Sequence, residues 1–245
     1  MSITSQEKTA LSPSAAAPVI DAPTAWALDD GTYEQSIGSA LGGEFIWLNR
    51  FTPDPNDLPM FLEQVQVLFP SGAGVDVGDL VDIHIYEDTD GDADPATGAR
   101  LVQSIMSAPV QAVDGVTWSY FDIPGWAFLG GPGDVLIAVV NRTAGTNIGD
   151  SPAALDQGVS QGRSWIGINA SATIANPPVL PSSTIWNTID ALGYSGNWLI
   201  RASGSPLSSI DTSSVPAMTG LGGAALTIIM GAIGAAVRRK RLKGE

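Results

Sequence analysis

Turn-forming residues recur throughout residues 26–203, and the apolar segments between them are short. Breaks such as PDPND, PSGAG, DGDADP, GGPGD and NPPVLPSS divide this region, and the whole chain contains 28 glycines, 17 prolines and 19 aspartates. Gly, Pro and Asp favour turns, whereas the Glu and Lys residues that usually cover helix surfaces are scarce. The sequence therefore argues against a mainly helical protein and favours short strands joined by turns.

Nine apolar runs in this region have the length of single strands. In one of them, LVDIHIY at Leu80–Tyr86, apolar and polar residues alternate, as they do in a strand with one face in a core. Many short strands without helical segments between them indicate an all-β protein, and we predict an antiparallel, jelly-roll-like β-sandwich. The predicted strands are Glu44–Phe51, Leu62–Phe69, Leu80–Tyr86, Arg100–Met106, Thr117–Asp122, Val135–Asn141, Arg163–Ile168, Thr184–Ile189 and Trp198–Ala202.

An uncharged apolar segment, Ala217–Val237, lies close to the C-terminus. Its 21 residues would form a helix of about 31 Å, which matches the hydrocarbon thickness of a bilayer. Five of the eleven basic residues occupy the last eight positions, whereas the chain up to Val237 has a net charge of -18. An apolar helix followed at once by basic residues predicts a single transmembrane helix with a cytoplasmic C-terminus, and the alternative is a buried core helix of the soluble domain. The basic stop consists of Arg238, Arg239, Lys240 and Arg241.

These features divide the chain into four predicted parts. Residues 1–25 are low in aromatics and rich in Ala, Ser, Thr and Pro, so we expect them to be disordered. The β-sandwich covers residues 26–203, and a Ser-rich linker follows at 204–214. Residues 215–245 contain the membrane helix and its basic tail.

The last part resembles the tripartite sorting signals of bacterial surface proteins. Val215 and Pro216 come directly before the apolar segment and the arginine cluster. The arrangement is similar to the IPTL-CTERM kind, a relative of PEP-CTERM, with VPAM standing where those signals often have IPTL or VPTL. The resemblance implies a sorting motif at Val215 and Pro216 and an exosortase-type transpeptidase as a partner.

Residues 1–26 show no basic segment followed by an apolar core, which a signal peptide would have. With a C-terminal span alone, the body would stay in the cytoplasm and the basic tail would point outward, against the positive-inside tendency. We nevertheless expect export, through a leader missing from this sequence or by an unconventional route. The body then lies outside the cytoplasm, anchored in a bacterial cell envelope.

The body resembles β-sandwich domains of secreted and surface-anchored bacterial proteins. Such modules accompany sorting signals or are appended to secreted peptidases and adhesins, and most lack an assigned activity. The resemblance implies an extracellular accessory or interaction module and supplies no catalytic residues. It rests on DDGT (Asp29–Thr32), NRFTP (Asn49–Pro53), IYEDTDGD (Ile85–Asp92), GDVLIAVVNR (Gly133–Arg142), RSWIG (Arg163–Gly167) and GNWLIRA (Gly196–Ala202).

One loop, residues 87–94, has the composition of a metal site, because carboxylates occupy every second position. Ca²⁺ prefers six to eight oxygen ligands, and a divalent cation removes the repulsion between neighbouring carboxylates. The EF-hand pattern is not met, since Ala93 and Ala99 stand at its sixth and twelfth positions. The alternative is a solvated acidic turn. The predicted Ca²⁺ ligands, with a stiffening role, are Asp88, Asp90, Asp92 and Asp94.

Residues suited to catalysis are few. The chain has no cysteine, which excludes disulfides, thiolate metal sites and cysteine nucleophiles, and His84 is its only histidine. We expect His84 on the solvent-facing side of its strand. The segment Gly162–Ile166 lacks the second glycine of G-x-S-x-G. We therefore predict no enzymatic activity, and a secreted hydrolase with two carboxylates converging in a cleft is kept as an alternative.

Some of the seven tryptophans are candidates for ligand binding, because flat aromatic faces can stack on sugars as well as fill a core. We expect Trp47, Trp165 and Trp198 in the core. A row of exposed tryptophans on one sheet face would instead indicate a module that binds exopolysaccharide. The candidate ligand-binding residues are Trp118, Trp126 and Trp186.

The sequence thus predicts a membrane-anchored, surface-displayed structural or adhesive β-sandwich protein that calcium stabilises. An extracellular carbohydrate-binding module and a secreted hydrolase are the alternatives. The net charge of -14 argues against a nucleic-acid partner, because phosphate binding needs a concentrated positive field. The expected partners are a membrane, a transpeptidase and, for the first alternative, a surface polysaccharide.

Overall fold

The computed structural model describes residues 3–7, 24–168, 173–183 and 185–207, which belong to one compact unit. These residues form fourteen strands and one short 3-10 helix, η1 (Asp190–Leu192). The strand pairs in the sheets are antiparallel, so the predicted all-β class with antiparallel sheets is confirmed. No helix within the described residues has the length and apolar character needed to cross a bilayer. The predicted membrane helix at 217–237 lies outside them.

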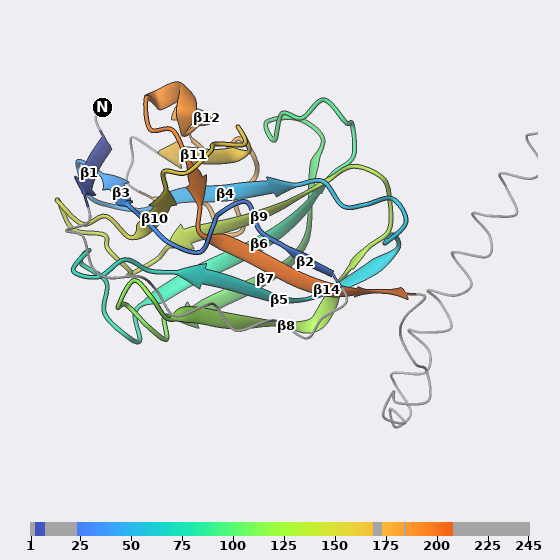
Figure 1. The fold of residues 1–245 in the computed structure, drawn as a ribbon, viewed down its shortest axis with the longest axis horizontal. Helices are drawn as coiled ribbons and strands as arrows, with labels where there is room; N and C mark the ends of the chain where they lie inside the picture. The colour runs from blue at the N-terminus through green and yellow to red at the C-terminus, as the bar shows by residue number, and fades with distance from the viewer. Residues whose placement is uncertain (1–2, 8–23, 169–172, 184, 208–245) are drawn as a thin grey trace, which may run out of the picture. The chain divides into compact units, whose positions relative to one another are not determined.

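The strands build three sheets (Figure 1). The largest has the order β12-β11-β4-β9-β6-β7, a second has β2-β14-β5-β8, and a third has β1-β3-β10-β13. The strand bounds are β1 (Ile3–Glu7), β2 (Thr24–Trp26), β3 (Gln35–Ser39), β4 (Phe45–Phe51), β5 (Met60–Leu68), β6 (Leu80–Asp88), β7 (Ala99–Pro109), β8 (Trp118–Leu129), β9 (Asp134–Asn141), β10 (Ala153–Asp156), β11 (Ser164–Ile168), β12 (Ile185–Thr188), β13 (Asn197–Trp198) and β14 (Ile200–Pro206).

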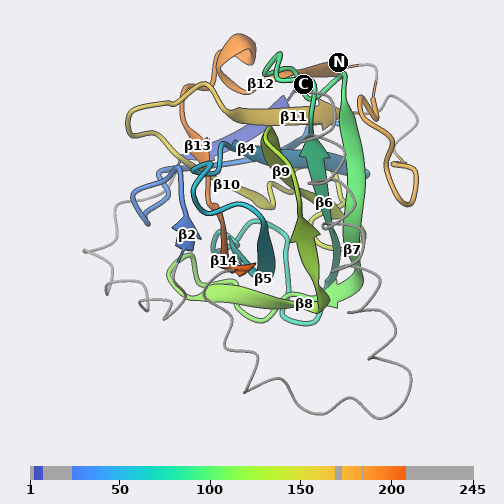
Figure 2. The ribbon, with the colours of Figure 1, turned by 90° about the vertical axis from the view of Figure 1, so that its right-hand side faces the viewer.

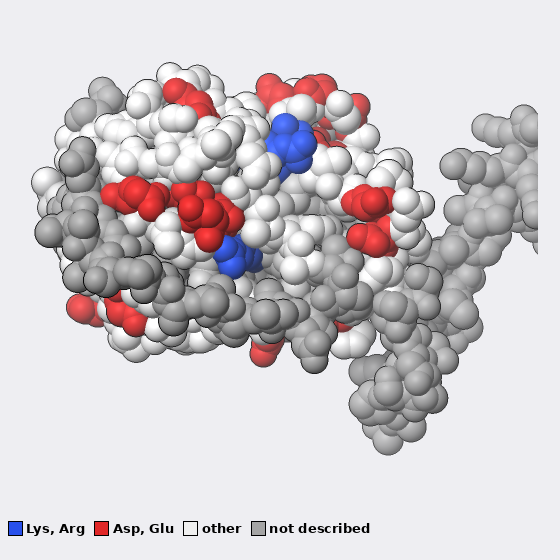
Figure 3. Space-filling view, viewed as in Figure 1, with Lys and Arg blue, Asp and Glu red and all other residues white. Residues whose placement is uncertain are grey.

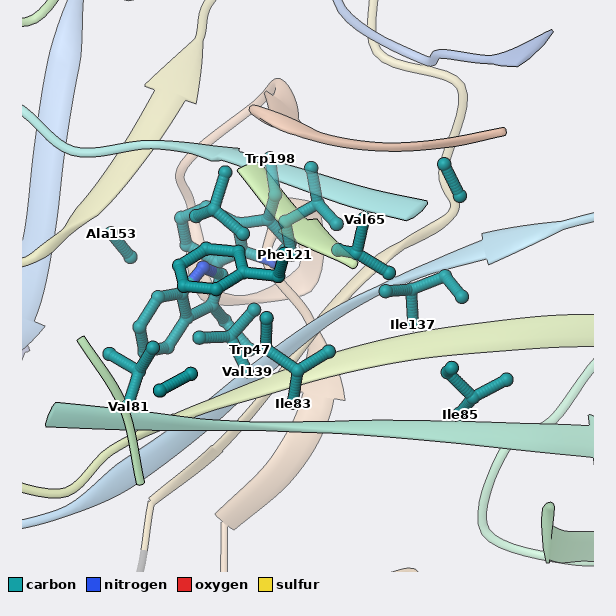
Figure 4. Close-up of a cluster of buried hydrophobic side chains, with 14 of the residues drawn as sticks. Trp47, Val65, Val81, Ile83, Ile85, Phe121, Ile137, Val139, Ala153 and Trp198 are labelled. Carbon is teal, nitrogen blue, oxygen red and sulfur yellow. The ribbon is translucent and has the colours of Figure 1, made fainter. Parts of the chain in front are cut away.

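The six-stranded sheet and the β2-β14-β5-β8 sheet face each other across the main core. Figure 4 shows Trp47 and Ile83 of the first sheet pointing toward Val65 and Phe121 of the second, and all four are nearly inaccessible to solvent. The sheets meet at one edge, where β7 and β8 lie side by side (Figure 2). The result is a β-sandwich-like all-β fold.

The six-stranded sheet is buried on its outer face as well. Successive residues of β9 point to opposite faces of the sheet, as period-two geometry requires. Ile137 belongs to the core between the sheets, whereas its neighbour Ala138 packs with Ile174 and Leu180 in a second cluster on the outer face. The segment that contains Ile174 and Leu180 therefore acts as a cover for this face.

His84 on β6 is fully buried, so the expectation that it faces solvent is wrong. Its Nδ1 lies 2.8 Å from Ser104 Oγ, and its Nε2 has no hydrogen-bond partner among the described residues. The outer face around it is covered, since the Tyr86 hydroxyl donates to the Pro178 carbonyl at 2.9 Å. The alternation in Leu80–Tyr86 predicts that one face of the strand is exposed to solvent. In the structure, the segment that contains Ile174 and Leu180 covers that face.

Two predicted segment boundaries also differ from the structure. Ile3–Glu7 lies in the N-terminal part predicted to be disordered, yet it forms β1, because each of its residues pairs with one in β3. Strand β14 continues to Pro206, so residues 204–206 of the predicted linker extend the ladder with β5. In both cases a neighbouring strand supplies hydrogen bonds that composition does not reveal.

The buried imidazole makes stability depend on pH. Burial lowers the pKa of His84 from 6.5 to about 4, with a smaller upward effect of Asp82 and a downward one of Arg142. Between those pH values the unfolded chain binds more protons than the folded protein, so stability is lost as pH falls through this range. His84→Gln removes this titration. We expect its melting temperature to fall less than that of the wild type between pH 7 and 4, measured by circular dichroism, and identical pH profiles would contradict the assignment.

Candidate metal centre

The acidic residues predicted as ligands lie where β6 ends and the loop to β7 begins. Asp88 is the last residue of β6, and it pairs with Ala99 of β7 on one side and with Asp134 of β9 on the other. Residues 88–98, called the metal loop below, therefore start from a strand held on both sides. The hairpin fixes the first carboxylate before the loop turns out toward solvent.

Three carboxylates of the metal loop converge. One oxygen from each of Asp88, Asp90 and Asp92 lies within 4.8 Å of the others. Asp88 is only 1% exposed, and neither of its carboxylate oxygens has a hydrogen-bond partner among the described residues. Asp90 and Asp92 are exposed. A buried carboxylate without a partner costs free energy, which a bound cation at this point would offset.

The electrostatics of Asp88 would favour a positive charge beside it. Burial, together with the nearby carboxylates of Asp90, Asp92 and Asp134, raises the pKa of Asp88 to about 6, against a lowering effect of Arg50. Arg50 is engaged with Asp134 in an ion pair, so it neutralises that acid first. The loop thus concentrates negative charge beside a side chain that is poorly solvated, which is the situation a divalent cation relieves.

Local hydrogen bonds hold the two exposed carboxylates in place. The Thr97 hydroxyl lies 3.0 Å from Asp90 Oδ2 and 2.8 Å from Asp92 Oδ2, and it donates to this pair. The Asp94 amide donates to Asp92 Oδ1 at 2.8 Å. These bonds from Thr97 and Asp94 also keep the pKa of Asp92 below its usual value. Both exposed carboxylates are therefore oriented by the loop itself, and the hydrogen bonds to Asp92 favour its ionised form.

Asp94 does not join the three other predicted ligands. Its Oδ1 accepts the Ala96 amide at 2.9 Å and closes the turn. Two residues that sequence reasoning missed shape the site instead, Thr97 within the loop and Asp134 from β9. Thr97 follows the acidic run closely and could have been considered. Asp134 is brought in only by the pairing of β6 with β9.

The tryptophans predicted to bind ligand do not form a row. Trp118 is 3% exposed, with the Arg201 guanidinium 4.4 Å above its ring. Trp126 is 47% exposed on the same strand, β8. Trp186 belongs to the other sheet and packs against Trp165, with ring centroids 6.1 Å apart. Only Trp126 presents a large part of its ring to solvent.

A cleft of about 280 Å³ adjoins the metal loop. It is lined by Gly91 and Ala93 of the loop, by the chain that follows β4, and by the chain that precedes β9. Of the described residues that line it, Asp134 is the only carboxylate, and it is paired with Arg50. This cleft does not hold the two converging carboxylates that a glycoside hydrolase needs.

The predicted sorting motif Val215-Pro216 and the basic stop lie outside the described residues.

Together, the fold and the site define an all-β, β-sandwich-like protein with a candidate cation-binding loop. No model of a known protein family matches the chain, and no curated protein does. Among solved structures, the chain is similar to the cysteine protease and lectin-like domains of Cwp84, a surface layer associated protein of Clostridium difficile. The identity is 15% and the TM-score is 0.46, over 74% of this chain and 35% of that one. The chain spans about a third of that structure's length.

Gly98 permits the close approach of two ligands. A Cβ atom there would lie 2.5 Å from Asp90 Cγ and 2.7 Å from Asp88 Oδ1. We expect Gly98→Ala to displace both carboxylates and to weaken Ca²⁺ binding at least ~10-fold, about 1.4 kcal/mol, measured by isothermal titration calorimetry.

Gly91→Ala is the matched control for that substitution. Gly91 has a φ of 76°, similar to the 68° of Gly98, so alanine is strained to the same degree at both positions. Among the described residues, however, nothing lies within 4 Å of a Cβ at Gly91. Its Ca²⁺ affinity should stay close to that of the wild type, and equal losses in the two variants would show that Gly98 acts only through backbone strain.

Proposed function

We propose that this chain is a membrane-anchored, surface-displayed structural or adhesive protein whose jelly-roll-like β-sandwich is stabilised by Ca²⁺. The observation that supports it is the Asp88 carboxylate, which is buried, has no partner among the described residues, and lies beside the carboxylates of Asp90 and Asp92. Asp88, Asp90 and Asp92 would hold the ion. A protein whose clearest site would bind an ion that stiffens the fold is suited to a structural or adhesive role at a cell surface.

The donor set favours Ca²⁺ over transition metals. The cluster offers only carboxylate oxygens, which suit hard cations, whereas Zn²⁺ and Cu²⁺ favour imidazole or thiolate. The chain has no cysteine, and its single histidine is buried on β6 beside Ser104. Ca²⁺ also tolerates irregular coordination completed by water, while Mg²⁺ demands a near-octahedral shell. An exposed loop with one buried anchor fits the more permissive ion.

The ion would join the metal loop to the end of β6. Asp88 ends β6 and lies opposite Asp134 of β9, which is paired with Arg50 of β4. Gly130, in the connection before β9, donates its amide to Glu87 at 2.8 Å. Ca²⁺ held by Asp88, Asp90 and Asp92 would therefore tie the metal loop to the end of β6, which is itself fixed within the six-stranded sheet.

Calcium should raise the stability of the folded protein. Because the ion binds the folded loop and not the unfolded chain, a free Ca²⁺ concentration of about 100 times Kd adds about 2.7 kcal/mol. We expect the melting temperature to rise by several degrees with Ca²⁺ and to fall on chelation with EDTA. Asp88→Asn should abolish this response, measured by differential scanning calorimetry.

Asp94→Asn is the matched control in the same loop. An asparagine oxygen can still accept the Ala96 amide, and Asp94 lies outside the three-carboxylate cluster. This variant should keep the calcium response of the wild type. If EDTA leaves the wild-type melting temperature unchanged, the metal loop is only an acidic turn and the calcium part of the proposal is wrong.

Anchoring is tested by fractionating cells that express the full chain. The uncharged segment Ala217–Val237 and the basic cluster after it support a membrane helix with the body outside the cytoplasm. We expect the chain in the membrane fraction, with the body open to external protease, and in the soluble fraction once residues 217–237 are deleted. Recovery of the full chain in the cytosol would overturn the anchoring.

The mature C-terminus tests whether an exosortase-type transpeptidase processes the chain. If it does, sequencing of the exported protein should show an end near Pro216 of the proposed sorting motif. An exported chain that keeps the intact sequence RRKRLKGE would rule out processing while leaving the anchoring in place.

A further inference from the structure

Three aromatic side chains gather on the outer face of the β2-β14-β5-β8 sheet. Phe61 of β5 lies opposite Phe128 of β8, with ring centroids 5.4 Å apart, and the Trp126 ring is 5.7 Å from Phe61. Their strand neighbours Leu62 and Ala127 point into the core. Phe61, Trp126 and Phe128, called the apolar trio below, are thus on the side of the sheet away from the core, and Trp126 is 47% exposed.

A bulge in β8 brings Trp126 to this position. The register passes from Leu62↔Ala127 to Gln64↔Asp122, so residues 123–126 lie opposite a single residue, Glu63. Trp126 has a φ of 58°, an unfavourable conformation for a bulky side chain. Bulges re-aim side chains and are kept where the new direction is useful. The strand therefore tolerates backbone strain and, in the same bulge, turns a large aromatic ring toward solvent.

The chain leaves the sandwich beside the apolar trio. In the last described strand, Ser205 pairs with Phe61 and Pro206 with Met60. The Leu207 amide then donates to the Pro59 carbonyl at 2.9 Å. Strand β14 ends at the right of Figure 1, beside the beginning of β5. The exit point of the chain and the exposed aromatic ring belong to the same end of the same sheet.

A short connection separates that exit from the proposed membrane helix. Residues 208–216 are nine residues, four of them serine. Nine residues reach about 32 Å at most when fully extended. A tether of this length keeps the surface near its exit at a local concentration in the millimolar range relative to the lipid. A weak contact between the apolar trio and the bilayer would then be well populated.

We propose that the apolar trio docks into the headgroup region of the membrane that holds the C-terminal anchor, so that the sandwich lies against the bilayer. The inference rests on the proposed anchoring. Trp and Phe side chains favour the boundary between water and hydrocarbon, where an aromatic ring can bury apolar surface. The docking would give the body a defined orientation relative to the bilayer.

Charge at this end also bears on the docking. The chain is acidic, and acidic side chains form patches on the face shown in Figure 3. The metal loop is at the end of the sandwich where the chain exits, since Gly91 and Ala93 share the cleft with Leu58, two residues before β5. Ca²⁺ bound there would neutralise two negative charges of the metal loop. It would thereby reduce the repulsion between this end of the protein and anionic lipid.

A saccharide is the other candidate for an exposed aromatic ring, and the surroundings favour lipid. Sugar recognition needs free polar side chains beside the ring to hydrogen-bond the hydroxyls. One polar pair across these strands is already engaged, because Gln64 Nε2 donates to Asp122 Oδ1 at 2.8 Å. The apolar trio also lies beside the point where the chain leaves toward the proposed membrane anchor. This position would bring the trio close to lipid, whereas it offers no advantage for binding a free glycan.

The test uses the full chain in vesicles of phosphatidylcholine and phosphatidylglycerol with Ca²⁺ present. Because the chain has no cysteine, Glu63→Cys, opposite the Trp126 bulge, accepts a single fluorescent label. We expect spin-labelled lipid to quench this label several-fold more than a label at Ile148→Cys. Ile148 is 77% exposed in the loop after β9, at the other end of the sandwich. Adding Trp126→Ala should bring the quenching at position 63 down to that at 148.

Flotation of the vesicles separates this inference from the anchoring on which it rests. A chain that floats with the vesicles, but is quenched equally at positions 63 and 148, overturns the docking and leaves the anchoring intact. A chain that does not float overturns both. Protection of position 63 by added oligosaccharides without lipid would assign the apolar trio to glycan and overturn the lipid proposal.

Discussion

The burial of the six-stranded sheet on both faces is the constraint on which the structure depends. Every residue of β9 is buried, and its alternate side chains enter two different clusters. A slip of one residue would exchange the two sets and leave neither cluster filled, so the register of β4, β9 and β6 is strongly specified. That register sets Asp88 opposite Asp134, and Arg50 of the adjacent β4 forms an ion pair with Asp134. Hydrophobic packing therefore fixes where the metal loop begins, while the loop's own sequence supplies the acids and the residues that orient them, Thr97 and Gly98.

Apolar runs made most of the fold predictable from the sequence, while strands with few apolar residues were missed. The nine predicted strands correspond to the strands from β4 to β9 and to β11, β12 and the β13–β14 region. The third sheet was overlooked because β3 reads QSIGS and β10 reads AALD, neither of which shows clear alternation. These strands are buried by what packs around them, and that is a tertiary effect. In the candidate site, alternating aspartates identified Asp88, Asp90 and Asp92, but the role of Asp94 depends on turn hydrogen bonds that spacing alone cannot supply.

The candidate metal centre combines one buried acid with two exposed ones. Asp88 is poorly solvated, and Asp90 and Asp92 repel its carboxylate. Gly98 leaves room for Asp88 and Asp90 to approach each other, and the Thr97 hydroxyl donates to the exposed pair. Such a loop would be stabilised by the proposed cation. It differs from an EF-hand in that a β-hairpin, and not a helix pair, supplies the rigid frame.

The position of β14 determines how the protein would respond to being pulled by its C-terminal end. This strand lies between β2 and β5, with ladders on both sides. Tension applied at Leu207 acts along the strand axis, roughly at right angles to the hydrogen bonds of an antiparallel ladder. Both ladders would have to shear together, instead of opening one bond at a time as in unzipping. A molecule tethered at this point would resist drag from flow or from a bound neighbour through a strand that is paired on both sides.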